Sequence, residues 1–196
     1  VGIIDSGIDY NHEFLKERII DEGYNFSTSG DSTSMSDDPK SHGTHVAGII
    51  VDNTPENVKI KGYKIFNSSG NSSNVAVVAA VEQAVADGMD IINMSFGGSS
   101  SSAVRESLLD AYNKGVTLVA ATGNTYKHLG NLLPAALDEV ISVTAVNSNL
   151  EFAEFSAYGP SVDLCAPGVD IYSTVNNNSY GNSSGTSMAA PFVSAC

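Results

Sequence analysis

Short apolar runs that read as strands alternate with helical segments along almost the whole chain. Strands are predicted over residues 1–4, 58–66, 90–95, 116–121, 140–146, 163–168 and 171–175. Helices are predicted over residues 42–50, 75–86, 103–113 and 188–196, with a short one over 11–16. This alternation predicts an α/β fold, a mostly parallel, doubly wound sheet with helices on both faces. Because the sequence shows no repeat or linker, we predict a single domain over residues 1–196.

The two ends of the chain interrupt this pattern. The sequence begins with Val1 inside a strand-like run and stops within an apolar helix at Cys196. We therefore expect a domain truncated at both ends, a processed piece or an excerpt of a longer precursor. Because a cut helix would expose the apolar faces of its neighbours, we also expect these residues alone to fold poorly.

The charge balance excludes some partners. The net charge is −13, and only 16% of the residues are charged while 42% are hydrophobic. Nonspecific nucleic-acid binding is not expected, because it needs a basic patch that releases counterions. The acidic surface should mildly favour basic substrates. No apolar run approaches the length of a membrane span, so no membrane span is predicted in this segment.

The number and spacing of the cysteines do not indicate a disulfide framework. Cys165 and Cys196 are the only two cysteines, and their spacing is not that of a paired metal site. Both lie in apolar sequence, which favours buried free thiols. Whether the two are paired stays open at this point.

Three glycine-rich motifs supply the side chains of nucleophilic catalysis. They are Asp5-Ser6-Gly7, the run from His42 to Gly48, and the run from Gly185 to Pro191. A serine is a weak nucleophile until a base takes its proton, and a carboxylate can fix the tautomer of that base. Ser187 would follow a sharp turn and open a helix with Pro191 in its first turn, where an oxyanion is stabilised. Taken alone, however, Ser187 also reads as a helix N-cap, and Asp5 as a turn residue.

Other polar residues fall where predicted strands end. Asp5, Ser95, Gly97 and Asn124 all lie at predicted carboxyl ends, which could share one edge of the sheet. Asn124 is equally well a left-handed turn residue after Gly123. His42 and His45 lie on one face of a predicted helix, and such a pair is also typical of metal ligands. Because no third ligand is evident nearby, we interpret one histidine as a base and the other as structural.

Six sequence motifs, in this order, resemble those of the subtilisin-like serine proteases across nearly the whole chain. They are Asp5 to Ile8, Ser41 to Gly48, Asn93 to Gly98, Ala120 to Asn124, Ala166 to Gly168, and Gly185 to Pro191. The order Asp, His, Ser is the family's own. Any one of these motifs is weak evidence, but all six together are specific.

The resemblance implies roles for individual residues. Ser187 is similar to the nucleophile, His42 to the general base and acid, Asp5 to the carboxylate that orients it, and Asn124 to the oxyanion donor. The wall of the pocket for the residue before the scissile bond would be Ser95, Phe96, Gly97 and Gly98. The segment that pairs with the substrate backbone would be Gly70, Asn71 and Ser72.

The resemblance further implies a secreted or cell-surface serine endopeptidase. Its partners would be peptide or protein substrates and a pro-segment in the precursor, and its chemistry would require no cofactor. We expect activity to fall below about pH 6.5, where free histidine gains its proton. The sequence leaves open whether the enzyme degrades many proteins or processes a single precursor.

Some positions depart from the family pattern. Residues 52–57 are shorter than the calcium-holding loop of many relatives, so no tight calcium site is expected there. The loop of Asp31, Asp37 and Asp38 could hold a weaker ion, and the sequence assigns a structural calcium to no particular residues. Phe192 stands where many relatives have histidine, and Leu132 lies near the pocket floor. With Phe96 and Leu132 in reach, we expect an apolar residue before the scissile bond rather than Arg or Lys.

Two other classes of function compete with this interpretation. An inactive, subtilisin-like binding domain would usually lack a triad or oxyanion residue, and all four are present. An esterase of another fold would want a Gly-x-Ser-x-Gly turn, which Ala189 breaks at its last position.

Overall fold

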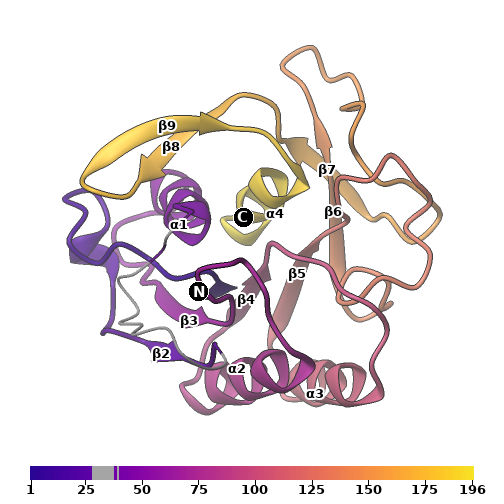
Figure 1. The fold of residues 1–196 in the computed structure, drawn as a ribbon, viewed down its shortest axis with the longest axis horizontal. Helices are drawn as coiled ribbons and strands as arrows, with labels where there is room; N and C mark the ends of the chain where they lie inside the picture. Colours follow the sequence, from indigo (N-terminus) through magenta and orange to yellow (C-terminus); the bar gives the residue numbers. More distant parts are fainter. Residues whose placement is uncertain (28–37, 39) are drawn as a thin grey trace.

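A seven-stranded parallel sheet forms the centre of the molecule (Figure 1). The computed structural model describes residues 1–27, 38 and 40–196. In this part of the chain the strand order is β2-β3-β1-β4-β5-β6-β7. The strands are β1 (Gly2–Asp5), β2 (Tyr24–Asn25), β3 (Lys61–Lys64), β4 (Ile91–Met94), β5 (Thr117–Ala121), β6 (Ile141–Val146) and β7 (Leu164–Pro167). A separate antiparallel hairpin consists of β8 (Ile171–Val175) and β9 (Ser179–Ser183).

Helices cover both faces of the sheet, as the sequence predicted. The helices are α1 (His42–Asp52), α2 (Asn74–Ala86), α3 (Ser102–Asn113) and α4 (Thr186–Ser194). Figure 1 shows α2 and α3 on one side and α1 and α4 on the other. Each side has its own apolar core, because α2 and α3 bury alanine, valine and leucine side chains against the strands while α1 and α4 bury theirs against the opposite face. The predicted α/β class is therefore confirmed.

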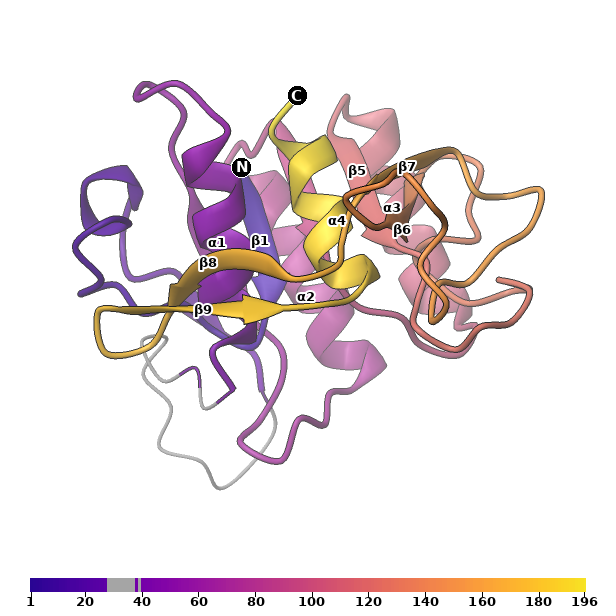
Figure 2. The same ribbon diagram turned by 90° about the horizontal axis from the view of Figure 1, so that it is seen from above.

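The β8–β9 hairpin lies against α1 (Figure 2). A side chain at Gly48 would come within 2.3 Å of the hydroxyl oxygens of Ser173 and Thr174. These hydroxyls donate to the backbone oxygens of His45 and Thr44 at 2.8 and 2.7 Å. Glycine is needed here because the helix and the strand approach so closely.

Two local predictions are wrong. Residues 11–16 do not form a helix but turns that lead into a short 3₁₀ helix, Lys16–Arg18. The reason is a tertiary contact, since the His12 ring bonds to the backbone oxygen of Ser179 at 2.9 Å. Both cysteines are free and exposed rather than buried. Cys165 is exposed because β7 is an edge strand of the sheet.

Candidate active site

The four residues predicted to be catalytic all lie at one edge of the sheet. Asp5 ends β1, and Asn124 comes shortly after β5. Strands β1, β4 and β5 are parallel neighbours, so their carboxyl ends meet at the same edge. Helices α1 and α4 start at this edge, with His42 as the first residue of α1 and Ser187 as the second of α4. A cleft of about 370 Å³ opens there, lined in part by Asp5 and His42.

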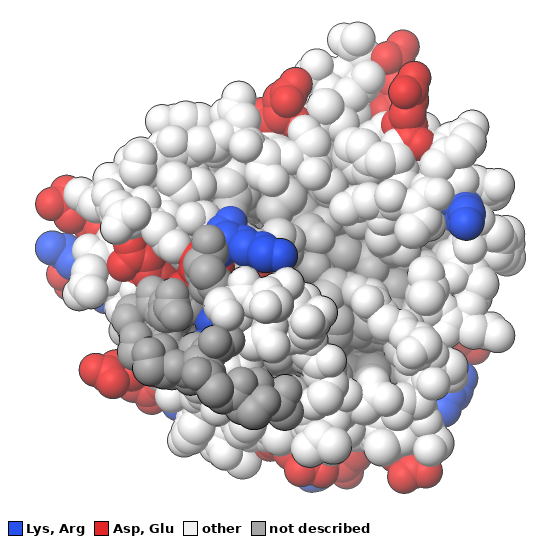
Figure 3. Space-filling model, in the orientation of Figure 1, with Lys and Arg blue, Asp and Glu red and all other residues white. Residues whose placement is uncertain are grey.

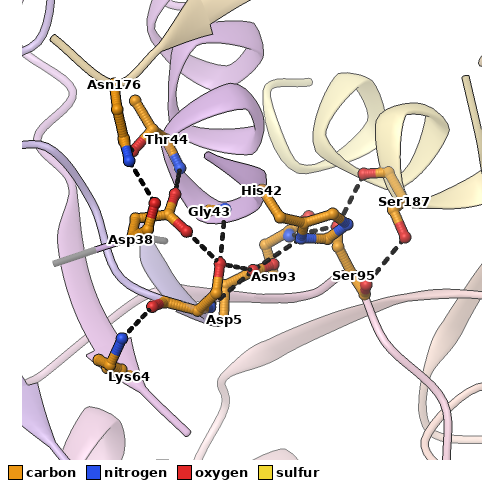
Figure 4. Close-up of polar contacts among 11 residues, drawn as sticks. Asp5, Asp38, His42, Gly43, Thr44, Lys64, Asn93, Ser95, Asn176 and Ser187 are labelled. Carbon is orange, nitrogen blue, oxygen red and sulfur yellow. Dashed lines mark hydrogen bonds and ion pairs between the residues drawn. The ribbon is translucent and has the colours of Figure 1, made fainter. Parts of the chain in front are cut away.

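Asp5 and His42 form a hydrogen-bonded pair (Figure 4). Nδ1 of His42 donates to Oδ1 of Asp5 at 2.7 Å, and Asp5 is only 1% exposed. This bond fixes the proton on Nδ1 and leaves Nε2 as an acceptor. The negative charge of Asp5 is the main cause that raises the pKa of His42, against the opposing effect of burial. The imidazolium is thus stabilised where it would have to form.

A second buried carboxylate, Asp38, lies behind this pair. The hydroxyl of Ser6 lies 2.7 Å from Oδ1 of Asp38 and 3.0 Å from Oδ1 of Asp5. The backbone N–H of Thr44 donates to Oδ2 of Asp38 at 2.9 Å, and that of Gly43 donates to Ser6 Oγ at 3.0 Å. Figure 4 shows how these contacts join the start of α1 to the end of β1. Burial raises the pKa of Asp38, which is completely inaccessible.

The sequence does not reveal this role of Asp38. It suggests the residue only as part of a loop that could hold an ion. The one local signal was an aspartate a few residues before His42, which does not reveal a partner near the start of the chain.

Ser187 lies in the first turn of α4 but is not its N-cap. Gly185 occupies the N-cap position, so the N-cap interpretation of Ser187 is wrong. Pro191 lies inside the helix rather than in its first turn, which is a second correction. Because proline has no N–H, it cannot donate to the backbone oxygen of Ser187. That oxygen accepts the hydroxyl of Ser95 instead, at 2.8 Å.

The Ser187 hydroxyl is bonded to the end of β4. Ser187 Oγ donates to the backbone oxygen of Ser95 at 2.9 Å (Figure 4). Among the described residues, no hydrogen bond joins it to His42. Catalytic hydrogen bonds are often long or absent before substrate binds.

Asn124 presents an amide donor beside Ser187. Its Oδ1 accepts the backbone N–H of Thr186 at 2.8 Å and the Thr186 hydroxyl at 3.0 Å. These bonds leave Nδ2 without a partner in the described part of the chain. A side chain at Gly185 would come within 3.1 Å of Nδ2, so glycine keeps this donor accessible. Gly123, with φ of 100°, takes the left-handed conformation, and Asn124 does not.

Residues of both predicted substrate-binding segments line the cleft. They are Gly70 of the first segment, and Ser95 and Phe96 of the second. An adjoining cavity of about 230 Å³ is lined by Ser72, Phe96, Gly97 and Gly98, among others. Asn71 does not line either cavity, and its backbone oxygen accepts the N–H of Asn67 at 3.0 Å.

Leu132 is not at the cleft. It is partly buried and packs against the core beside α2 and α3. Leu133 and Pro134 line the adjoining cavity in its place. Their position is set by two backbone hydrogen bonds between Leu133 and Gly98, at 2.8 and 3.0 Å.

His45 has a structural environment. It is 3% exposed, and its Nε2 lies 3.0 and 3.1 Å from the backbone oxygens of Ile171 and Gly181. Burial lowers its pKa, which favours a neutral ring. Among the described residues, no group of three or more His, Cys, Asp or Glu side chains could hold a metal ion. Asp31 and Asp37, which the sequence suggested for a weaker ion, lie outside the described residues.

The buried guanidinium of Arg18 is bonded to the short segment that follows α1. Arg18 donates to the backbone oxygens of Val58 at 2.6 Å and Pro55 at 2.7 Å. It also donates to the hydroxyl of Thr54 at 2.8 Å, and it is 8% exposed. Oxygens of this segment therefore already face a cation supplied by the protein.

Comparisons with known proteins identify the family. Residues 1–196 match the family model of the subtilase family. The chain belongs to this family. It is 42% identical to subtilisin DY of Bacillus licheniformis over 98% of the chain and 73% of that protein. It is 37% identical to a thermophilic serine proteinase of Bacillus sp. strain AK1, over 98% of the chain and 49% of the relative. The family is therefore one of serine-type proteases.

Solved structures of subtilases share the fold. A cold-adapted subtilisin-like serine proteinase superposes with a TM-score of 0.89 at 33% identity, covering 99% of this chain and 71% of the other. The epidermin leader peptide processing serine protease of Staphylococcus aureus also superposes with a TM-score of 0.89, at 26% identity, covering 99% of this chain and 62% of the other. The chain thus spans between about half and three quarters of the relatives that it matches. In the described part of the chain, no helix is long and apolar enough to cross a membrane.

Proposed function

We propose that the complete protein is a serine endopeptidase that hydrolyses peptide bonds through an acyl-enzyme on Ser187. The observation that carries this proposal is the buried Asp5–His42 pair at 2.7 Å, at the same edge of the sheet as a helix-borne serine. The free Nδ2 of Asn124 beside Gly185 supports it further.

In the proposed reaction, the Ser187 hydroxyl leaves the Ser95 backbone oxygen and gives its proton to Nε2 of His42. Its oxygen attacks the substrate carbonyl, and the resulting oxyanion accepts from Asn124 Nδ2 and the Ser187 N–H. His42 then protonates the leaving amine. In the second half of the reaction, water gives a proton to His42 and attacks the acyl carbonyl, and His42 returns that proton to Ser187 Oγ as the acid leaves. Asp5 holds the imidazolium throughout. This scheme uses groups of the protein and one water molecule, and it needs no cofactor.

The substrate would bind as an added strand between the segment of Gly70, Asn71 and Ser72 and the segment from Ser95 to Gly98. Phe96 lines both cavities, which favours an apolar residue before the scissile bond. We propose that the protein works outside the cell or at its surface and is made with a pro-segment, as is usual for the family. A narrower role in leader-peptide processing has one specific support, the likeness to an epidermin leader peptide protease and a lanthipeptide protease.

We also propose that residues 52–57 hold no tight calcium ion in the complete protein, because Arg18 already bonds to oxygens of this segment. Calorimetric titration with calcium should show no tight binding that Asp52→Ala abolishes. Such a loss would contradict this part of the proposal.

A serine-directed phosphonate tests the proposed reaction. The complete protein, freed of any pro-segment, should take up one label on Ser187 and should cut a denatured protein. The Ser187→Ala variant, folded as judged by circular dichroism, should do neither. If the wild type is neither labelled nor active, the inactive binding-domain alternative replaces this proposal.

A further inference from the structure

One exposed cation lines the cleft of this acidic protein. The sequence has 22 acidic and 9 basic residues apart from histidine. Two formally charged side chains other than histidine line the cleft in the described part of the chain, Asp5 and Lys40. Asp5 is buried and bonded to His42, whereas Lys40 is exposed. Of the described residues, the exposed charge that an entering substrate meets in the cleft is therefore positive. Figure 3 shows basic atoms beside the hollow on this face.

Lys40 reaches from the start of α1 to the predicted substrate-binding segment. It comes two residues before His42, and a side chain at Gly70 would lie 2.5 Å from its Nζ. Its ammonium group has no ion pair or hydrogen bond among the described residues, unlike two other lysines. Lys61 pairs with Asp21 at 2.8 Å, and Lys114 with Asp110 at 2.7 Å. Within residues 1–27, 38 and 40–196, Lys40 thus has no carboxylate partner.

The geometry of a bound strand indicates which substrate residue meets this cation. Successive side chains of an extended peptide point to opposite sides. If the residue before the scissile bond points toward the wall formed by Ser95 to Gly98, the residue preceding it points the other way. His42 and Lys40 line the cleft but not the adjoining cavity that Gly97 and Gly98 line, so we place the preceding residue beside them.

We propose that Lys40 selects substrates with Asp or Glu as the second residue before the scissile bond. This inference rests on the proposed function and specifies its substrate class. It runs against the mild preference for basic substrates that the net charge suggests. The local cation prevails because salt screens charges beyond about 8 Å, while a cleft side chain lies in direct contact. Contact in a partly dry cleft also strengthens the interaction of the two charges.

Matched peptides test this specificity. Three peptides would share an apolar residue before the scissile bond and carry Glu, Gln or Lys before that residue. At low salt, wild-type kcat/KM should be roughly 5-fold higher for Glu than for Gln, the size of a good exposed ion pair. Lys40→Gln should bring this ratio close to one, and Lys40→Glu should favour the Lys peptide. The assay pH should lie well above the acid limb, because Lys40 also lowers the pKa of His42.

Lys114→Gln is the matched control, because Lys114 lies just after α3 on the opposite face of the sheet. It should keep the wild-type ratio. Equal rates for Glu and Gln peptides in the wild type, or a preference that survives in Lys40→Gln, would overturn the inference. Binding of the same peptides to the Ser187→Ala variant separates this inference from the proposed chemistry. Tighter binding of the Glu peptide supports the role of Lys40 even without turnover, and equal binding rejects it.

Discussion

The two halves of the candidate site differ in which groups their hydrogen bonds join. In the acid–base half, side-chain hydrogen bonds of 2.7 to 3.0 Å join Asp5, Ser6, Asp38 and His42 to one another, although Oδ2 of Asp5 is buried without a partner among the described residues. In the nucleophile half, Asn124 Nδ2 has no partner in the described part of the chain, and the Ser187 hydroxyl rests on a backbone oxygen rather than on His42.

This difference separates groups that orient from groups that react. The orienting groups keep the same partners from substrate binding to product release, so the protein can bond them permanently. The groups that touch substrate must change partners during the reaction, so strong bonds within the protein would oppose catalysis. Preorganised donors that stay free for a developing charge are the larger source of rate enhancement.

The strongest test of the comparison removes the two groups that must meet. We expect Ser187→Ala and His42→Ala each to lower kcat by roughly 10⁶-fold, the size known for subtilisin, from which we take it. The double variant should be no worse than either single variant, since the two side chains act as one unit. Single-turnover assays on a peptide substrate measure this. Losses that multiply in the double variant would contradict it.

The next largest loss of kcat is expected when the amide donor of Asn124 is removed. Asn124→Ala should lower kcat by about 10²–10³-fold with little change in KM, because one oxyanion donor is lost while the nucleophile remains. Asn124→Asp is the sharper variant, because it keeps an oxygen for Thr186 and loses the amide donor. It should be at least as slow as the alanine variant. Near wild-type turnover in Asn124→Asp would show that Nδ2 has no role in the reaction.

The fold and the position of the site were predictable because they depend on local patterns. Apolar runs showed the strands, and Asp5 and Asn124, each close to a glycine, marked strand ends that must share an edge in a parallel sheet. Supporting residues were not predictable in this way. Asp38 contacts Ser6, which lies 32 positions earlier, and Arg18 contacts Val58, 40 positions later. Such partners follow from packing, and no spacing in the sequence encodes them.

A prediction on stability concerns Arg18, which bonds to the segment that follows helix α1, the helix that carries His42. Helix α1 begins at His42 and ends at Asp52, and Arg18 bonds to the segment that follows it. Arg18→Ala should lower the free energy of unfolding by about 3 kcal/mol, because backbone oxygens of Pro55 and Val58 lose buried donors. Urea denaturation of the complete protein measures this. Arg105→Ala, on the exposed side of α3, is the control and should change little. If both variants lost the same free energy of unfolding, the hydrogen bonds of Arg18 would not account for the effect.

The smallest expected effect concerns Asp38, which supports the acid–base half without touching substrate. In Asp38, Oδ1 accepts the Ser6 hydroxyl and Oδ2 accepts the Thr44 N–H. An asparagine side chain has only one oxygen, so in Asp38→Asn one of these two donors loses its acceptor. A freed Ser6 hydroxyl can donate to Oδ1 of Asp5, 3.0 Å away, and weaken the hold of Asp5 on His42. We expect Asp38→Asn to lower kcat by roughly 10-fold, the low end of the effect seen when a residue that orients a functional side chain is replaced.

The pH profile of Asp38→Asn distinguishes this positioning role from a purely structural one. Activity needs neutral His42, and Asp5 raises the pKa of His42, so the wild-type acid limb should lie above the ordinary value of about 6.5 rather than at it. The charge of Asp38 raises this pKa further. Removing that charge should therefore move the acid limb of kcat/KM to lower pH, while Asp110→Asn on α3 leaves it in place. A lower melting temperature with an unmoved acid limb would mean that Asp38 only stabilises the fold.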